Sequence, residues 1–286
     1  MNESKLAYLK QRATDIRRMA IESIYHARSG HPGGCLSVAD ILSVLYFDFL
    51  RVDPKSPDDP TRDRFVLSKG HACPALYAAL AIKGYFPHEE LSRLRKLDSL
   101  LQGHPDTRTP GIDVPSGSLG MGLSQGLGMA MAGQYLQQDF QVVVVLGDGD
   151  MQEGNTWEAL MAAGHHQVEN LTAIYDANGM QGEDWVEIQM NHLPMLNRLD
   201  AMGWDSQEIN GHDINAIRQS LKLARKQKRP SFIKANTIKG KGIAMMENSL
   251  PWHGSVEITG EELTLANSQL KLSSQLATGE SNNEYA

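Results

Sequence analysis

The sequence has little cysteine, no hydrophobic run long enough to cross a membrane and no excess of positive charge. Only Cys35 and Cys73 occur among 286 residues, with no CxxC pair and no zinc-ligand spacing. This excludes a disulfide framework and a cysteine-based zinc site, and it favours a reducing compartment. Residues 1–10 carry charges and no apolar core. We therefore expect a cytoplasmic chain without a targeting segment or a membrane span.

The charge balance is acidic. A formal net charge of -7 and a pI of about 5.8 provide no electrostatic basis for binding nucleic acid. With 41% hydrophobic residues, the chain is long enough to bury a substantial core. An anionic ligand would need a local cluster of hydrogen-bond donors.

Short β-branched runs alternate with longer amphipathic segments. Apolar residues recur at three- and four-residue intervals from Leu9 to Ile24, which is typical of a helix face. This alternation predicts an α/β fold: a doubly wound, mainly parallel sheet with helices on both faces. We expect one domain over residues 1–260 and a polar C-terminal extension at 261–286, mobile in its last dozen residues. The expected helices are 6–27, 37–49, 74–83 and 88–97, the expected strands are 64–67, 141–146, 171–175 and 231–236, and 103–118 is expected to be a functional loop.

A Gly-Asp-Gly sequence follows the strand expected at 141–146. Parallel strands end at one sheet edge, where helix N-termini offer N–H groups to anions. Gly147 and Gly149 let the backbone approach a diphosphate, whereas Asp148 repels a diphosphate unless a cation lies between them. Taken alone, the motif fits an ordinary tight turn best.

The next expected strand leads to Asn178, thirty residues after Asp148. The amide oxygen of Asn178 and the carbonyl of Met180 would join Asp148 at the same sheet edge. Mg²⁺ prefers about six oxygen ligands, often one or two protein groups completed by phosphate oxygens and water. We therefore expect Asp148, Asn178 and Met180 to bind Mg²⁺, with Ca²⁺ or Mn²⁺ as substitutes.

The sequence here resembles the thiamine diphosphate enzymes, which share the order strand, Gly-Asp-Gly, helix, second strand and Asn. In those enzymes the Asn follows about thirty residues after Gly-Asp-Gly. Further motifs narrow the resemblance to the transketolase family, and together they cover residues 6 to about 260. They occur in transketolase order: Ser29-Gly30-His31-Pro32-Gly33, Ser68-Lys69-Gly70-His71, Gly103-His104-Pro105, Gly117-Ser118-Leu119-Gly120-Met121-Gly122, Gly147-Asp148-Gly149-Asp150-Met151-Gln152-Glu153-Gly154 and Trp252-His253-Gly254.

The resemblance implies catalytic roles for four histidines, whose ordinary pKa near neutrality suits proton transfer between hydroxyls. His31 and His253 are implied to flank the substrate hydroxyls and carbonyl oxygen, and His104 to bond the terminal hydroxyl of the donor. His71 is implied to lie near the diphosphate and the reacting centre, and both His71 and His253 to contact the cofactor. Any one of them alone would more often be an ordinary polar loop residue.

Further cofactor contacts are implied for the backbone. The family holds the aminopyrimidine side of thiamine diphosphate at the positions of Gly117 and Leu119, and the diphosphate near Gly149. Full-length relatives often carry Pro and Gln where this chain has Ser118 and Met121, so we infer no contact from those two side chains.

Three features have two interpretations each. Glu153 matches a family glutamate at the subunit interface, or it supplies negative charge at a helix N-terminus. Residues 239–242, Lys-Gly-Lys-Gly, hold phosphate or form a solvated basic turn. His165 and His166 lie within a helix and are interpreted as exposed or capping residues.

The resemblance also implies missing parts, because transketolases continue with a pyrimidine-binding domain and a C-terminal domain. The glutamate that activates the aminopyrimidine ring and the main sugar-phosphate-binding residues belong to the pyrimidine-binding domain. We therefore expect the N-terminal, diphosphate-binding subunit of a split transketolase, which uses thiamine diphosphate and Mg²⁺ to transfer a two-carbon ketol unit from a ketose phosphate to an aldose. A separately encoded C-terminal subunit would complete an α2β2 assembly with sites at its interfaces.

Two alternatives remain open. The α-subunit of a 2-oxo-acid dehydrogenase shares Gly-Asp-Gly and Asn and also needs a partner, although the SGHPGG and GHPD loops favour transketolase. A noncatalytic thiamine diphosphate-binding or assembly protein would keep the metal site without a productive partner. Several sugar phosphates, ordinary and branched, are compatible with the sequence.

Overall fold

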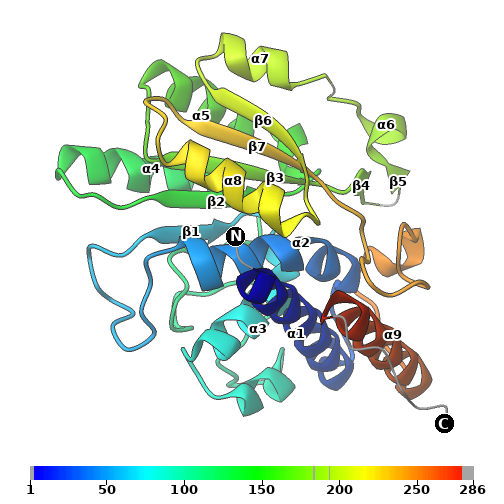
Figure 1. Ribbon diagram of the computed structural model, residues 1–286. Helices are drawn as coiled ribbons and strands as arrows, with labels where there is room; N and C mark the ends of the chain where they lie inside the picture. Colours follow the sequence, from blue (N-terminus) through cyan, green and yellow to red (C-terminus); the bar gives the residue numbers. More distant parts are fainter. Residues whose placement is uncertain (1–2, 183, 193, 279–286) are drawn as a thin grey trace.

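The five strands of the central sheet are all parallel and lie in the order β1-β2-β3-β7-β6 (Figure 1). The computed structural model describes residues 3–182, 184–192 and 194–278. Four of the strands are those expected from the sequence. The strand bounds are β1 Arg64–Leu67, β2 Val142–Leu146, β3 Leu171–Ala177, β6 Asp205–Asn210 and β7 Ser231–Asn236.

Alternate residues of β2 belong to two separate hydrophobic cores. Val143 and Val145 pack into one core, whereas Val142, Val144 and Leu146 pack into the other. Because successive side chains of a strand point to opposite faces, helices cover both faces of the sheet. The expected α/β fold with a parallel sheet is confirmed.

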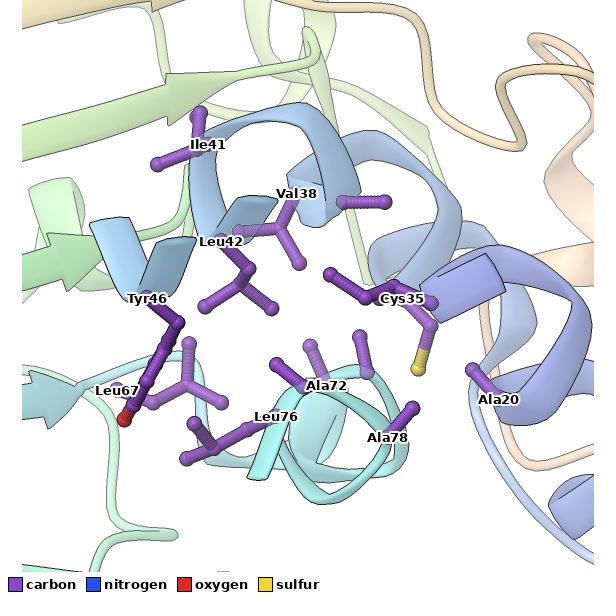
Figure 2. Close-up of a cluster of buried hydrophobic side chains, with 14 of the residues drawn as sticks. Ala20, Cys35, Val38, Ile41, Leu42, Tyr46, Leu67, Ala72, Leu76 and Ala78 are labelled. Carbon is purple, nitrogen blue, oxygen red and sulfur yellow. The ribbon is translucent and has the colours of Figure 1, made fainter. Parts of the chain in front are cut away.

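Five helices contribute to the core on one side of the sheet: α1 (Glu3–Ala27), α2 (Pro32–Val44), α3 (Cys73–Lys83), α8 (Ile214–Ala224) and α9 (Gly260–Thr278). Figure 2 shows Val38 and Leu42 of α2 and Leu76 of α3 directed into the same apolar space. All of α2 is buried. Within the described residues, Pro32–Phe49 is the one helical segment long and apolar enough to cross a membrane, and here it is a core helix.

The other face is covered by α4 (Met121–Tyr135), α5 (Gly154–His165) and α7 (Leu196–Ala201). Leu123 of α4, Leu160 of α5 and Leu199 of α7 pack with the β2 and β3 side chains of this face. Beyond the carboxyl end of β3 lie a small antiparallel hairpin, β4 (Met180–Gln181) and β5 (Asp184–Trp185), and the short helix α6 (Val186–Gln189).

Three elements differ from the expectation. The helix expected at 88–97 is only a 3₁₀ turn, His88–Arg93, and it cannot continue to residue 97 because Arg95 has a φ angle of 60°, outside the right-handed helical region. β6 was not expected, since its sequence DSQEIN has one apolar residue and forms a partly exposed edge strand. α2 begins at Pro32 rather than at residue 37, because proline fits the first helical position.

The polar end of the chain forms α9, which the sequence did not lead us to expect. Ala266 and Leu270 of this helix are buried in the core that contains α1. Thr259 and Glu262 form a capping box, with each backbone N–H bonded to the other side chain at 2.8 and 3.2 Å. The domain boundary at residue 260 stays a prediction, and the last dozen residues lie mostly outside the described part of the chain.

Candidate functional site

The loops that follow β1, β2, β3 and β7 enclose one pocket. The strand register aligns Leu67 with Val145, Leu146 with Tyr175 and Ala177 with Asn236, so these loops leave the same sheet edge. Seven residues predicted from the sequence line this pocket: His71, Leu119, Asp148, Gly149, Asn178, Met180 and His253. Lys69, Gly147, Asp150, Gln181, Gly182 and Lys239 complete it.

Asp148 is buried, and its two carboxylate oxygens have different partners. Oδ1 accepts hydrogen bonds from the Tyr175 hydroxyl at 2.6 Å and from the Gly179 N–H at 3.3 Å, whereas Oδ2 accepts from the Asn178 N–H at 3.2 Å. Burial raises the pKa of Asp148 to about 6, although the Tyr175 hydrogen bond opposes this shift. A nearby cation would therefore stabilise the charged carboxylate.

The Met180 carbonyl and the Asn178 side chain lie beside Oδ2 of Asp148. The inward-facing atom of the Asn178 amide is 3.1 Å from the Met180 oxygen and 3.2 Å from Asp148 Oδ2. With its nitrogen inward, the amide donates hydrogen bonds to both oxygens. With its oxygen inward, the amide accepts a hydrogen bond from the Met180 N–H at 3.3 Å and also faces the other two oxygens, an arrangement that a cation among the three would stabilise.

Basic side chains surround the rest of the pocket. The ring centroids of His31 and His71 are 5.3 Å apart, and those of His71 and His253 are 6.4 Å apart. Lys239 Nζ lies 2.6 Å from Nδ1 of His253 and donates to the Met180 carbonyl at 3.2 Å. Burial lowers the pKa of Lys239 to about 7, of His31 to about 4 and of His253 to about 3. A bound anion would favour the protonated forms, so the pocket suits an anionic ligand.

Two buried carboxylates hold the loops around the pocket together. Asp176 forms an ion pair with Lys69 at 2.5 Å and accepts hydrogen bonds from Ser37 at 2.7 Å and from Thr237. Asp150 accepts hydrogen bonds from the Ser68 hydroxyl at 2.5 Å and from the Gly120 and Gly147 N–H groups at 2.8 Å each. The loops after β1, β2, β3 and β7 are thereby joined to one another and to α2 and α4.

His104 and Gly117 lie beside the pocket and do not line it. A Cβ on Gly117 would be 3.2 Å from the His104 ring. Arg95 donates to the Ser29 hydroxyl at 2.6 Å, and its charge adds to burial in lowering the pKa values of His31 and His104. Nδ1 of His31 is buried and has no hydrogen-bond partner within the described part of the chain.

The model of the transketolase thiamine diphosphate-binding domain matches residues 9–275. The chain belongs to the transketolase family. It is 42% identical over 241 residues to a subunit of the apulose-4-phosphate transketolase of Phocaeicola vulgatus, covering 84% of this chain and 86% of the relative. It is also 42% identical over 266 residues to the 6-deoxy-6-sulfo-D-fructose transketolase subunit SqwG of a Clostridium species, covering 92% and 96%.

Full-length transketolases are matched over less than half their length. The crystal structure of Campylobacter jejuni transketolase superposes with a TM-score of 0.88 at 33% identity, covering 97% of this chain and 46% of that one. Human transketolase is 39% identical over 254 residues, which cover 88% of this chain and 40% of the human protein.

Several site residues of this transketolase-family chain were missed by sequence reasoning. Lys69 and Asp150 stand inside motifs that were identified, but no role was assigned to them. Each is a charged residue in a turn that follows a buried strand, and this position could have indicated a role at the pocket. Tyr175 and Arg95 carried no signal, because an aromatic residue in a strand and an arginine after a helical pattern are ordinary.

The residues for which the sequence allowed two interpretations have different surroundings in the structure. Glu153 is exposed and precedes α5. Gly120 has a φ angle of 82°, and a Cβ atom added to it would lie only 2.4 Å from the Cβ of Glu153. His165 and His166 are exposed at the end of α5, as expected. Lys239 faces the pocket, whereas Lys241 lies outside it and pairs with Glu247 at 3.2 Å.

Proposed function

We propose that this chain is the diphosphate-binding subunit of a two-subunit transketolase. It would use thiamine diphosphate and Mg²⁺ to transfer a two-carbon ketol unit from a ketose phosphate to an aldose acceptor. The observation that carries this proposal is the convergence of the Asp148, Asn178 and Met180 oxygens beside a buried basic pocket. Two relatives named as transketolase subunits have nearly the length of this chain. The 2-oxo-acid dehydrogenase alternative is not favoured, because these relatives and the matched structures are transketolases.

The spacing of the Asn178 oxygen from the other two oxygens suits neighbouring ligands of Mg²⁺. Ligands about 2.1 Å from Mg²⁺ and at right angles to each other lie about 3.0 Å apart. The inward atom of Asn178 is 3.1 and 3.2 Å from the other two oxygens, close to this spacing. Within the described residues, no group of three or more His, Cys, Asp and Glu side chains is placed to hold a metal ion, and the proposed set includes only one such side chain. Diphosphate oxygens and water would complete the shell, and Ca²⁺ or Mn²⁺ would substitute.

The basic side chains fit the diphosphate. Lys239 and His253 line the pocket on the side of Met180, and His71 stacks beside His253. Burial of Lys239 in this pocket lowers its pKa to about 7. A diphosphate held close to Lys239 would raise that pKa and supply the missing counter-charge. The backbone at Gly149 would lie against the same diphosphate.

Bound thiamine diphosphate supplies the electron sink for cleavage of the carbon-carbon bond. His31 and His253 would bind the substrate hydroxyls and carbonyl oxygen, with His104 at the terminal hydroxyl of the donor. Burial lowers the pKa values of these histidines below the near-neutral value expected from the sequence. They would therefore act first as neutral donors and acceptors, and a diphosphate held nearby would raise their pKa values.

We propose that α4 contacts the C-terminal partner subunit. Residues 114–138 contain no charged side chain, although Met131, Tyr135 and Leu136 are exposed on this helix, Tyr135 by 88%. A helix face in water normally carries charges, and exposed apolar patches mark interfaces. Glu153 lies beside the start of α4, which supports an interface role for it in an α2β2 assembly. A cytoplasmic location is part of the proposal and agrees with two free cysteines.

Reconstitution tests the proposal. The chain is co-expressed with its candidate partner, and the pair is assayed for ketol transfer with a panel of ketose phosphate donors and aldose acceptors. We expect transfer by the pair with thiamine diphosphate and Mg²⁺, and none by the chain alone or by a pair carrying Asp148→Ala. Full transfer by the chain alone would contradict the split arrangement. A pair that decarboxylates 2-oxo acids without ketol transfer, or a chain that binds cofactor but never assembles, would support one of the alternatives.

A further inference from the structure

Asp148 stands between two cavities. On one side it lines the pocket that contains Asn178 and Met180; on the other it lines a second cavity bordered by Tyr175, Gly179, Trp185, Lys234 and Asn236. Rotation about the last bond of an aspartate side chain is soft. With space on both sides, packing alone does not decide which oxygen faces the pocket. Hydrogen bonds must therefore set the orientation of the carboxylate.

The Tyr175 hydroxyl makes the shortest of these hydrogen bonds. It donates to Oδ1 of Asp148 at 2.6 Å, whereas the Gly179 N–H reaches the same oxygen at 3.3 Å. Tyr175 is itself firmly held, because it belongs to β3, is 2% exposed and packs against Phe232 with ring centroids 6.4 Å apart. Oδ1 is thereby bound on the side of Tyr175, and Oδ2 is left facing the Asn178 amide.

His192 sets the direction of the Tyr175 hydrogen bond. Its Nε2 lies 2.9 Å from the Tyr175 hydroxyl oxygen, and the residue is buried. If Nε2 were an acceptor, the proton of the Tyr175 hydroxyl would point at His192. The hydroxyl oxygen of Tyr175 and Oδ1 of Asp148 would then face each other without a proton between them. Because Tyr175 donates to Asp148, the matching tautomer has Nε2–H donating to Tyr175 and leaves Nδ1 of His192 as a buried acceptor without a partner among the described residues.

We propose that Tyr175 and His192 are positioning residues for the cation, an inference that rests on the proposed function. Neither residue touches the ion: His192 orients the Tyr175 hydroxyl, and the hydroxyl holds Asp148 so that Oδ2 joins the Asn178 and Met180 oxygens. Removing a hydrogen-bond partner of a metal-binding side chain typically costs about 10- to 100-fold in metal affinity. We expect that loss for Tyr175 and a smaller one for His192, which acts one step further away.

The test compares Tyr175→Phe, His192→Phe and the double variant with the unmodified chain, each assembled with the partner subunit. Thiamine diphosphate is titrated calorimetrically at a series of Mg²⁺ concentrations, which gives the Mg²⁺ concentration at half-maximal cofactor affinity. Tyr175→Phe should raise this concentration about 10- to 100-fold. The double variant should match Tyr175→Phe alone, because His192 acts through Tyr175. Tyr46→Phe is the matched control, since Tyr46 is also 2% exposed but its hydroxyl has no partner among the described residues.

The outcomes separate this inference from the proposed function. If the reconstituted pair binds neither thiamine diphosphate nor Mg²⁺, the proposed function fails. If it binds both and Tyr175→Phe needs no more Mg²⁺ than Tyr46→Phe, only the positioning role is overturned. Effects of Tyr175→Phe and His192→Phe that add in the double variant would refute the relay. Circular dichroism checks folding, and should Tyr175→Phe not fold, an unchanged Mg²⁺ requirement in His192→Phe decides against the inference.

Discussion

Replacing Asp150 with asparagine tests whether one buried carboxylate holds the pocket loops in place. The carboxylate accepts hydrogen bonds from Ser68, Gly120 and Gly147 at 2.5, 2.8 and 2.8 Å. An amide can keep its oxygen toward Ser68 and Gly120, but its NH₂ group then faces the Gly147 N–H, donor against donor. The unpaired N–H costs about 1–3 kcal/mol. The two remaining bonds lose their charged acceptor, at about 1 kcal/mol each.

Burial acts in the opposite direction. It raises the pKa of Asp150, because the buried carboxylate is poorly solvated, so a neutral amide recovers part of the loss. The three hydrogen bonds outweigh this term, and we expect Asp150→Asn to lower the free energy of unfolding by about 2 kcal/mol. Cofactor affinity should fall as well, since Gly147 lines the pocket.

Urea unfolding at pH 7 and calorimetric titration of thiamine diphosphate measure these two effects. Asp139→Asn is the matched control, because the Asp139 side chain is 94% exposed and its loss should cost less than about 1 kcal/mol. An Asp150→Asn variant that unfolds at the same urea concentration as the unmodified chain, and binds the cofactor as tightly, would refute this account of the loops.

Three further changes have distinct expected results. Asp148→Ala should abolish Mg²⁺-dependent cofactor binding. His253→Ala should alter cofactor affinity by only a few fold and lower the turnover of the reconstituted enzyme. Equal losses of cofactor affinity for the two variants, measured by calorimetry, would contradict this division of roles. Burial lowers the pKa of His31 to about 4, so the unfolded chain binds more protons than the folded one between about pH 6.5 and pH 4. The free energy of unfolding should therefore fall as the pH falls through this range, and His31→Gln should flatten the slope in urea titrations. Met131→Glu on α4 should weaken co-purification with the partner subunit and leave cofactor affinity unchanged. Leu223→Glu, at an exposed position on α8, should leave assembly intact. Equal losses of co-purification for the two variants would argue against α4 as the contact surface.

The fold was predictable where burial leaves a mark on the sequence. The Val-Val-Val-Val run of β2 is buried on both faces, so its hydrophobic pattern indicates a central parallel strand. β6 leaves no such mark, because an edge strand beside solvent can be polar. Arg95 ends the helical pattern through a left-handed backbone conformation that depends on its surroundings. The Thr259–Glu262 capping box was a readable signal for α9 that was overlooked.

The site was predictable where function depends on a residue type at a fixed place in a motif. Asp148 and Asn178 are such residues, because the proposed cation site needs their oxygens after two neighbouring strands. Tyr175 and His192 are different, since their effect on Asp148 depends on side-chain contacts between segments that only the folded chain brings together. A tyrosine in a strand and a histidine in a loop have many ordinary roles, and spacing does not distinguish them.

The two orientations of the Asn178 amide have a kinetic consequence. With nitrogen inward, the amide donates to Asp148 and Met180, and with oxygen inward it accepts from the Met180 N–H, so the amide has protein partners before metal is supplied. Admitting the ion then requires half a turn about one side-chain bond and no movement of the backbone. Such side-chain rotations are fast compared with the association of two protein subunits. We expect the rate of forming the active enzyme to depend on subunit concentration more than on Mg²⁺ concentration.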